Sequence, residues 1–356
     1  MSFFLYDTWY FACLSKDLRA GRMARRELLG EPVVMGRTKA GAPFALRDIC
    51  PHRAAPLSAG AICEAAAGNG AGDAAASVEC PYHGWKFRVA DGMCSEIPSL
   101  VADQAFEHER IRVKHYPLAE KDGLVWIYMP EGKRFEGAPE TPPPDLPASL
   151  GMPKLVERAR FDCHVDHAVV GLMDPAHGPY VHRQWWWRTG SSMHEKAKKF
   201  EPRPRGFAMV AHKPSSNSYA YKILGGAPTT EIVFQLPSIR TEHITNDKHQ
   251  ILGFTAVTPV NENATDITQV FYWDFPLFDF VRPAIRPFTR AFLKQDGDMV
   301  NLQQEGLKYD PNLMLIDDAD MQAKWYHQLK KEWVAARAES RAFANPVQET
   351  TLRWRS

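Results

Sequence analysis

Two short segments carry the side chains with the clearest metal-binding chemistry. Cys50 and His52 lie in one segment and Cys80 and His83 in the other, so each segment offers one thiolate and one imidazole. A structural zinc site could use the same four ligands, although its typical spacing pairs cysteine with cysteine and histidine with histidine. Mixed segments suit a [2Fe-2S] cluster in which two histidines replace two cysteines on one iron. The pattern therefore favours this cluster over zinc, and over four unrelated core residues.

A second candidate site contains two histidines that lie five residues apart. His177 and His182 follow Asp174 closely, with Gly178 and Pro179 between the two rings. At about 3.6 residues per turn a five-residue step rotates by about 140°, so a regular helix would not aim both rings at one point. The glycine and the proline can supply the necessary bend. Two ordinary loop histidines would be the default explanation, but a one-electron carrier in the same chain needs an acceptor site.

Two histidines and one carboxylate are the usual ligands of non-haem Fe(II) in oxygen chemistry, with open coordination positions for reactants. In the helix predicted after Pro287, Asp296 lies on the same apolar stripe as Phe288 and Phe292, whereas Asp298 points about 200° away. Asp296 is therefore the predicted third ligand. The alternative is a hydrogen-bonded helix carboxylate, which would be costly to bury without a cation.

The composition is that of a folded protein without an electrostatic footprint for nucleic acid. The 356 residues are 45% hydrophobic and 24% charged, and the formal net charge is +1. Nucleic-acid binding needs clustered positive charge, so nucleic acid is a poor candidate partner. No window approaches the ~18 consecutive apolar residues of a membrane-spanning helix, and Asp7 interrupts the start before a signal-peptide core could form. We therefore expect a cytoplasmic protein with no membrane span.

The distribution of strand and turn residues predicts two domains. Residues 1–133 contain short apolar runs broken by turn residues, which is typical of a small all-β module. The segment 64–76 within it is rich in small residues and is predicted to be a flexible surface loop. Prolines crowd the segment 134–153 and disfavour regular structure there. The second domain is therefore placed at 134–356.

The second domain is predicted to combine an antiparallel sheet with two long helices. Strand-like runs between 207 and 280 have no helix-length segments between them, which favours antiparallel pairing. Helices are predicted at about 287–307 and 318–340, the second with an apolar residue at every fourth position. The fold class is therefore α+β, with an all-β module at the N-terminus.

The two cysteine-histidine segments resemble the Rieske signature of the non-haem iron oxygenases. The resemblance implies that Cys50 and Cys80 bind one iron of a [2Fe-2S] cluster, and that His52 and His83 bind the other. Ala54 stands where the family usually has glycine. Respiratory-type Rieske proteins carry an extra cysteine in each loop, which this chain lacks, so the resemblance is to the soluble oxygenase branch.

The segment from Asp174 to His182 is similar to the mononuclear iron motif of the same family. The resemblance implies that His177, His182 and Asp296 bind the mononuclear iron, and that Asp174 is an electron-transfer bridge to the Rieske domain of a neighbouring subunit. It also implies a Rieske [2Fe-2S] domain at 1–133 and a catalytic helix-grip (START-like) domain with an antiparallel sheet at 134–356. His164 and His167 are predicted either to support the ligands or to be structural, and Gly171 stands where many members have asparagine.

By this resemblance the chain is a terminal oxygenase that uses O2 and electrons relayed from NAD(P)H. Because it has no Gly-x-Gly-x-x-Gly dinucleotide fingerprint, a separate ferredoxin or flavoprotein reductase is expected to deliver the electrons. The chain length resembles that of the homotrimeric demethylases and monooxygenases, which implies hydroxylation or oxidative demethylation of an apolar, aromatic or polycyclic small molecule. The alternatives are a ring cis-dihydroxylating dioxygenase, or a Rieske electron carrier without a working mononuclear iron. Apolar runs at 271–273 and 275–278 are predicted to line a substrate pocket or to fill the core.

Overall fold

The computed structural model describes residues 4–64, 76–101, 103–182, 193–214 and 226–356. The chain divides into two compact units, one of Tyr6–Pro144 and one of Met1–Leu5 with Asp145–Ser356. This division falls inside the proline-rich segment, and the domain limits 1–133 and 134–356 remain predictions. Nearly all of the predicted loop 64–76 lies outside the described residues.

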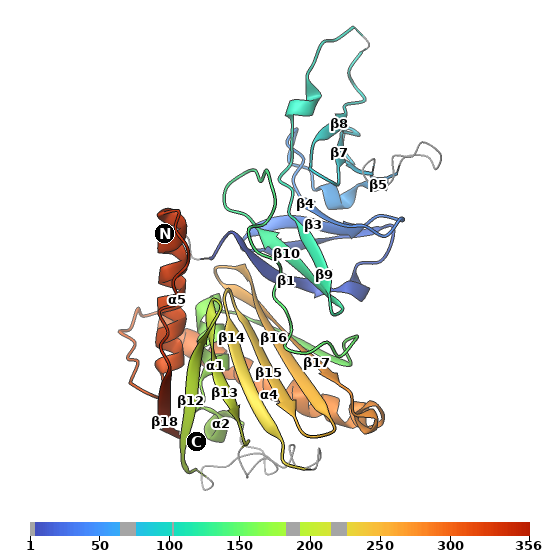
Figure 1. The fold of residues 1–356 in the computed structure, drawn as a ribbon. Coiled ribbons are helices and arrows are strands. Elements are labelled where there is room, and N and C mark those ends of the chain that lie inside the picture. The colour runs from blue at the N-terminus through green and yellow to red at the C-terminus, as the bar shows by residue number, and fades with distance from the viewer. Residues whose placement is uncertain (1–3, 65–75, 102, 183–192, 215–225) are drawn as a thin grey trace. The chain divides into compact units, whose positions relative to one another are not determined.

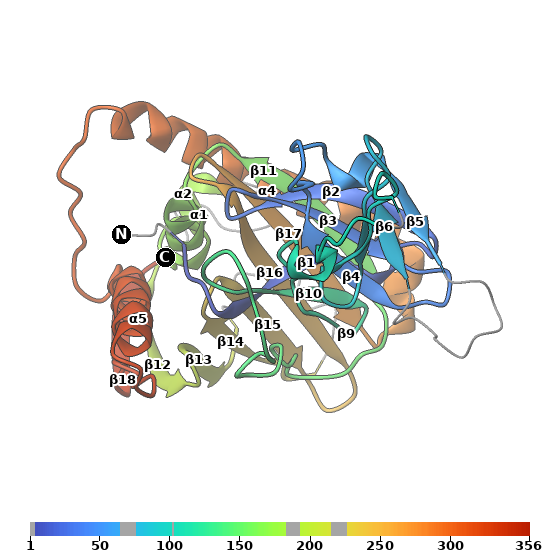
Figure 2. The same cartoon turned by 90° about the horizontal axis from the view of Figure 1, so that it is seen from above.

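The described residues of the N-terminal unit form three antiparallel sheets, and Figures 1 and 2 together label their strands. The first sheet has the order β1-β10-β9, with β1 (Thr8–Leu14), β9 (Leu118–Lys121) and β10 (Leu124–Met129). The second is β2-β3-β4, with β2 (Arg22–Leu28), β3 (Glu31–Arg37) and β4 (Pro43–Arg47). The third is β5-β6-β7-β8, with β5 (Ala61–Cys63), β6 (Ser77–Glu79), β7 (Lys86–Arg88) and β8 (Cys94–Glu96). The predicted all-β character of this module is confirmed.

The core of this unit reaches into the loops that carry the candidate cluster ligands. Cys50 and Cys80 are buried in one apolar cluster with Leu46, Leu57 and Phe87. Burying such side chains stabilises the fold by about 25 cal/mol per Å² of apolar surface removed from water. The first residue of each ligand loop is therefore anchored in the hydrophobic core.

The C-terminal unit is organised around one eight-stranded antiparallel sheet in the order β11-β17-β16-β15-β14-β13-β12-β18. Its strands are β11 (Leu155–Phe161), β12 (Glu195–Arg203), β13 (Gly206–His212), β14 (Thr229–Gln235), β15 (Ile239–Thr245), β16 (Gln250–Asn261), β17 (Ala264–Trp273) and β18 (Thr350–Arg355). The strands from β12 to β17 pair with their neighbours in the chain, as antiparallel hairpins do, and the first and last strands close the two edges. The predicted antiparallel sheet is confirmed.

Helices α1 (Val165–Met173) and α4 (Pro276–Leu307) lie behind this sheet in Figure 1, and α4 makes close contacts with its edge strand β11. Glu157 of β11 accepts hydrogen bonds from Arg286 and Arg290 of α4. A Cβ atom at Gly297 would lie 2.8 Å from Cε1 of Phe161, closer than side chains approach. Glycine at this position therefore allows α4 to approach β11, next to the predicted ligand Asp296.

The first long helix begins earlier than the sequence predicted. The prediction of a start near Pro287 was wrong, because α4 already begins at Pro276 and contains Pro283 and Pro287. Proline suits the first turn of a helix, where its missing N–H group is not needed. Phe278 in this first turn packs edge-on against Trp273, with ring centroids 5.9 Å apart, which adds tertiary support.

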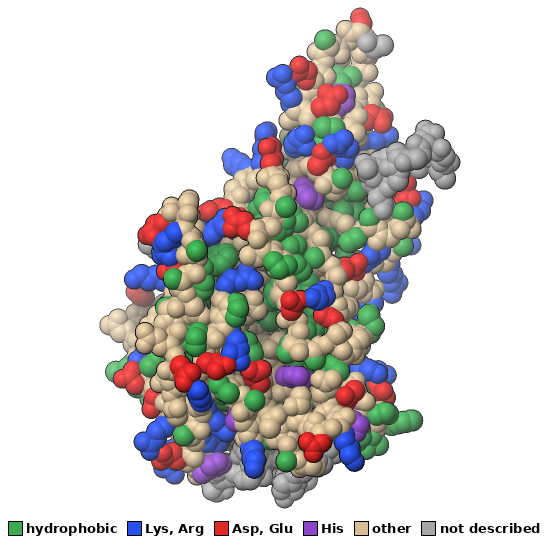
Figure 3. All heavy atoms as spheres, in the orientation of Figure 1, with side chains coloured by type: hydrophobic (Ala, Val, Ile, Leu, Met, Phe, Trp, Pro, Cys, Tyr) green, Lys and Arg blue, Asp and Glu red, His purple; other side chains and the backbone are tan. Residues whose placement is uncertain are grey.

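Helix α5 (Met321–Ala338) carries the apolar stripe that was predicted near the C-terminus. Trp325 contacts Phe200 of β12 and Phe207 of β13, and Tyr326 contacts Phe234 of β14. Among the described residues, no helix is both long and apolar enough to cross a bilayer. Figure 2 shows α5 beside β12 and β18, and on the face in Figure 3 acidic and basic side chains are interspersed.

Candidate metal centres

The two cluster loops share one backbone design. In the first, the Cys50 N–H donates to Ala55 O at 2.9 Å and the Ala54 N–H donates to Cys50 O at 2.9 Å. In the second, the Cys80 N–H donates to Trp85 O at 2.8 Å and the Gly84 N–H donates to Cys80 O at 3.1 Å. The fifth residue of each loop has a positive φ, 58° for Ala54 and 71° for Gly84. The loops therefore hold their cysteines in equivalent positions, with His52 as the third residue of its loop and His83 as the fourth.

The side chains of the two loops meet in pairs. The rings of His52 and His83 have centroids 4.5 Å apart, and His52 stacks on Trp85 at 4.7 Å with an interplanar angle of 6°. Burial raises the pKa of the Cys50 thiol to about 11, with a further contribution from the neighbouring thiol of Cys80. The structure thus brings the four predicted residues together as one thiol pair and one imidazole pair. This donor set fits a [2Fe-2S] cluster with sulfur ligands on one iron and nitrogen ligands on the other.

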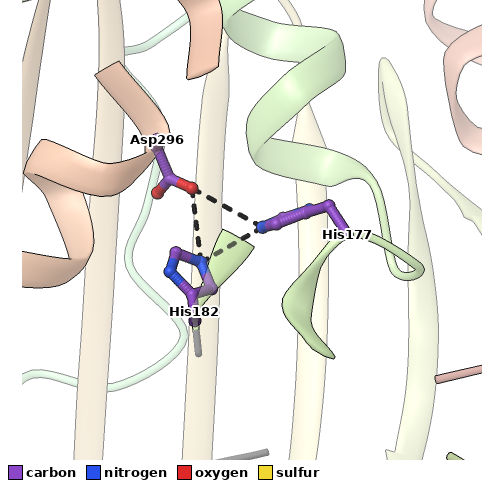
Figure 4. A group of neighbouring side chains, drawn as sticks. All are labelled: His177, His182 and Asp296. Atoms are coloured by element: carbon purple, nitrogen blue, oxygen red, sulfur yellow. Dashed lines mark hydrogen bonds and ion pairs between the residues drawn. The ribbon is translucent and has the colours of Figure 1, made fainter. Parts of the chain in front are cut away.

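The second candidate centre lies around the short helix α2 (Gly178–Val181). His177 is the residue before its first turn and His182 the residue after it, at φ −97° and ψ 61°. The bend expected at Gly178 and Pro179 takes the form of this single turn between the two rings. Asp296 approaches from α4, and Figure 4 shows its carboxylate facing both rings.

The three side chains converge at distances suited to one ion. His177 Nε2 lies 3.2 Å from His182 Nε2 and 3.5 Å from Asp296 Oδ1, and His182 Nε2 lies 3.3 Å from the same oxygen. Neighbouring ligands of an octahedral ion lie about 3 Å apart when each metal–ligand bond is about 2.1 Å. Two imidazoles and a carboxylate on one face fit the donor set of non-haem Fe(II). Asp298 instead forms an exposed pair with Lys294.

The second nitrogen of each imidazole has a different environment. His182 Nδ1 lies 3.0 Å from Gln295 Oε1, and the ring stacks on Phe292 with centroids 4.3 Å apart. His177 Nδ1 lies 3.7 Å from Asp174 Oδ2, beyond hydrogen-bonding distance. Burial raises the pKa of Asp174, with a smaller contribution from the Asp320 carboxylate, while the Ala176 N–H opposes this rise.

A cavity of about 290 Å3 borders the triad between α1, α4 and the start of α5. Its lining includes His177, Asp296 and Gly171, together with apolar side chains of α1 and α4. The apolar runs 271–273 and 275–278 do not line it. Instead, Trp273 and Phe278 form a core cluster with Leu155, which agrees with the second of the two predicted alternatives, that these runs fill the core.

Three residues that touch the predicted ligands were not predicted to do so. His164, which the sequence analysis set apart from the ligands, has a structural role. Gln295, Phe292 and Trp85 touch ligand rings, and their only signals were positions beside a motif residue or on its helical stripe. His164 caps α1 by accepting from the Asp166 N–H. The tryptophans at 185–187 lie outside the described residues.

Comparison with known proteins agrees with this architecture. Residues 8–117 match the Rieske [2Fe-2S] domain, and residues 161–336 match the vanillate O-demethylase oxygenase C-terminal domain. Chlorophyllide a oxygenase of Chlamydomonas reinhardtii is 34% identical over 180 residues, which is 50% of this chain and 24% of that protein. The dicamba O-demethylase oxygenase component of Stenotrophomonas maltophilia is 31% identical over 188 residues, covering 51% and 48% of the two chains. The chain thus aligns with less than half of each relative.

A solved structure extends the likeness to nearly the whole chain. Dicamba monooxygenase with non-haem iron and dicamba superposes with a TM-score of 0.68 at 22% identity, covering 94% of this chain and 98% of that one. An identity this low shows the fold alone. An all-β cluster domain followed by an antiparallel-sheet domain with a two-histidine, one-carboxylate centre defines the class of two-centre iron oxidoreductases. The chain belongs within that class to the Rieske non-haem iron oxygenases, as its two family matches show.

Proposed function

We propose that this chain is a terminal oxygenase component that hydroxylates or oxidatively demethylates an apolar, aromatic or polycyclic small molecule with O2. The observation that carries the proposal is the convergence of His177, His182 and Asp296 within 3.5 Å of one another in a chain that also has a Rieske module. A Rieske electron carrier would have no use for the second centre.

In this proposal each ligand set has its own task. Cys50, His52, Cys80 and His83 would hold the [2Fe-2S] cluster, while His177, His182 and Asp296 would hold the mononuclear iron. When bound, the two iron centres would supply electrons and activate O2, so that one oxygen atom enters the substrate and the other leaves as water. The protein would keep three ligands on one face of the iron, which leaves the opposite positions open to reactants.

Asp174 would link His177 electrostatically to the cluster of a neighbouring copy in a homotrimer. Its carboxylate lies 3.7 Å from His177 Nδ1, and its side chain keeps 34% of its surface exposed. A partly exposed acid beside a ligand is suited to contact a second protein surface. Nδ1 of His177 is buried and has no hydrogen-bond partner among the described residues. A small movement of Asp174 would therefore bring its carboxylate within hydrogen-bonding distance of this nitrogen.

The substrate and the redox partners are proposed from the cavity and from the relatives. The cavity beside the triad is lined mostly by apolar side chains, among them Val170, Leu172 and Met299, which supports an apolar substrate. The names of the two relatives refer to chlorophyllide a oxygenation and dicamba O-demethylation. A ferredoxin or a flavoprotein reductase would deliver electrons that originate from NAD(P)H.

A product screen tests the proposal. The purified chain is supplied with a surrogate ferredoxin and reductase, NADH, labelled O2 and a panel of methoxylated aromatic and apolar ring compounds. Incorporation of one labelled oxygen atom, or release of formaldehyde from a methoxy group, is expected for at least one compound. Incorporation of both atoms would instead identify a cis-dihydroxylating dioxygenase. Electron consumption without any product in the presence of loaded iron at both centres would contradict the proposal.

A further inference from the structure

The imidazole of His182 is held on three sides by residues of one helix. Asp296 Oδ1 lies 3.3 Å from Nε2, Gln295 Oε1 lies 3.0 Å from Nδ1, and the Phe292 ring stacks on the imidazole face with an interplanar angle of 26°. His182 itself is 6% exposed. These contacts leave the ring little freedom to turn.

We propose that Gln295 is a positioning residue that fixes the tautomer of His182 and thereby makes Nε2 the metal-binding nitrogen. An amide oxygen only accepts hydrogen bonds, so the proton must reside on Nδ1 of the neutral imidazole. The lone pair then lies on Nε2, which faces His177 and Asp296. This inference rests on the proposed mononuclear iron site and adds to it a residue outside the ligand set.

The choice of a neutral amide has a further consequence for charge. A glutamate at position 295 would also accept from Nδ1, but would place a second negative charge next to Asp296. Gln295 therefore orients the ring without changing the charge of the site. Its counterpart at His177 is weaker, because Asp174 lies 3.7 Å from Nδ1. The two histidines are thus held unequally, and His182 is the better-oriented ligand.

Metal affinity gives a readout that does not depend on turnover. The mononuclear site is emptied with a mild chelator and the protein is titrated with Co(II), which is followed by EPR while the oxidised cluster is silent. Losing an outer partner of a metal-binding histidine typically lowers affinity about 10- to 100-fold. We expect this loss in Gln295→Leu and in Gln295→Met, whereas Gln295→Glu, which restores the acceptor, should bind at least as tightly as the wild type.

A matched control comes from the same helix. Asp298→Asn changes an exposed side chain that pairs with Lys294 and should leave Co(II) affinity unchanged. The melting temperature and the visible spectrum of the cluster report whether each variant is folded. Wild-type affinity in both apolar variants would overturn the inference, and so would an equal loss in Gln295→Glu.

The proposed function itself fails by a different result. If His182→Ala binds Co(II) as tightly as the wild-type chain, then the triad is not the metal site and the proposed oxygenase function falls with it. If His182→Ala loses binding while Gln295→Leu and Gln295→Met keep it, only the role of Gln295 is wrong.

Discussion

The backbone of the first cluster loop carries a strain that a single substitution should relieve. Ala54 has φ 58° in the position where the second loop has Gly84 at φ 71°. An L-residue in this region costs roughly 1–2 kcal/mol, whereas glycine adopts it freely but gives the unfolded chain about 0.4–1 kcal/mol of extra conformational entropy. Ala54→Gly should therefore stabilise the N-terminal unit by about 1 kcal/mol.

The reciprocal variant sharpens this prediction. Gly84→Ala would acquire the same strain, and its new Cβ would lie 3.1 Å from Cγ of Pro98. It should destabilise the unit by about 1 kcal/mol. Ala59→Gly, at the exposed last residue of the 3-10 turn Leu57–Ala59, serves as the control. There the added glycine should only cost stability, by roughly 0.5–1 kcal/mol.

The assay is thermal unfolding of the cluster-loaded chain, followed by loss of the cluster's visible absorption. A change of about 1 kcal/mol corresponds to a shift of roughly 3 °C in a unit of this size. We expect a higher midpoint for Ala54→Gly and lower midpoints for Gly84→Ala and Ala59→Gly. A lower midpoint for Ala54→Gly, or no change for Gly84→Ala, would refute the argument from backbone strain.

Further predictions concern the C-terminal unit. Asp174→Asn should retain both iron centres but slow cluster reoxidation at least about tenfold in single-turnover experiments; a wild-type rate would remove its bridging role. Gly297→Ala should destabilise the unit and lower its mononuclear iron content. The new Cβ would lie 2.8 Å from the Phe161 ring, and this overpacking costs about 1–3 kcal/mol, more than the about 0.5–1 kcal/mol that alanine adds to helix stability. An unchanged melting temperature and iron content would contradict this prediction. Burial lowers the pKa of three histidines below their ordinary 6.5. As the pH falls below about 6.5, these histidines take up protons in the unfolded chain before they do so in the folded one, so the free energy of unfolding measured in urea should decrease. A flat profile between pH 7.5 and 5.5 would contradict the burial argument, which concerns His164, His167 and His327.

The sequence singled out the residues that the structure brings together, because each motif that contains them is short. Mixed cysteine-histidine loops and a pair of histidines around a glycine-proline bend are visible as short patterns, and Asp296 was separated from Asp298 by helical phase. The antiparallel sheet followed from strand runs without intervening helices. Each motif is recognised from residues close together in the chain, whereas the meeting of Asp296 with the two histidines depends on the fold.

Features that depend on tertiary contact were not predictable in the same way. Helix α4 begins at Pro276 and continues through Pro283 and Pro287, and the contact of Phe278 with Trp273 that supports its first turn is a tertiary contact. The hydrogen bond from His182 to Gln295 joins residues 113 positions apart. Such contacts leave no spacing pattern, so an amide beside a motif residue carries no signal until the fold is known.

Counting iron tests the central claim most directly. The account predicts about three irons and two acid-labile sulfides per wild-type chain, with two irons in the cluster and one at the triad. Asp296→Ala should fall to about two irons per chain while keeping the cluster's visible spectrum. A wild-type chain that holds only about two irons after full reconstitution, or an Asp296→Ala chain that still holds about three, would contradict the account.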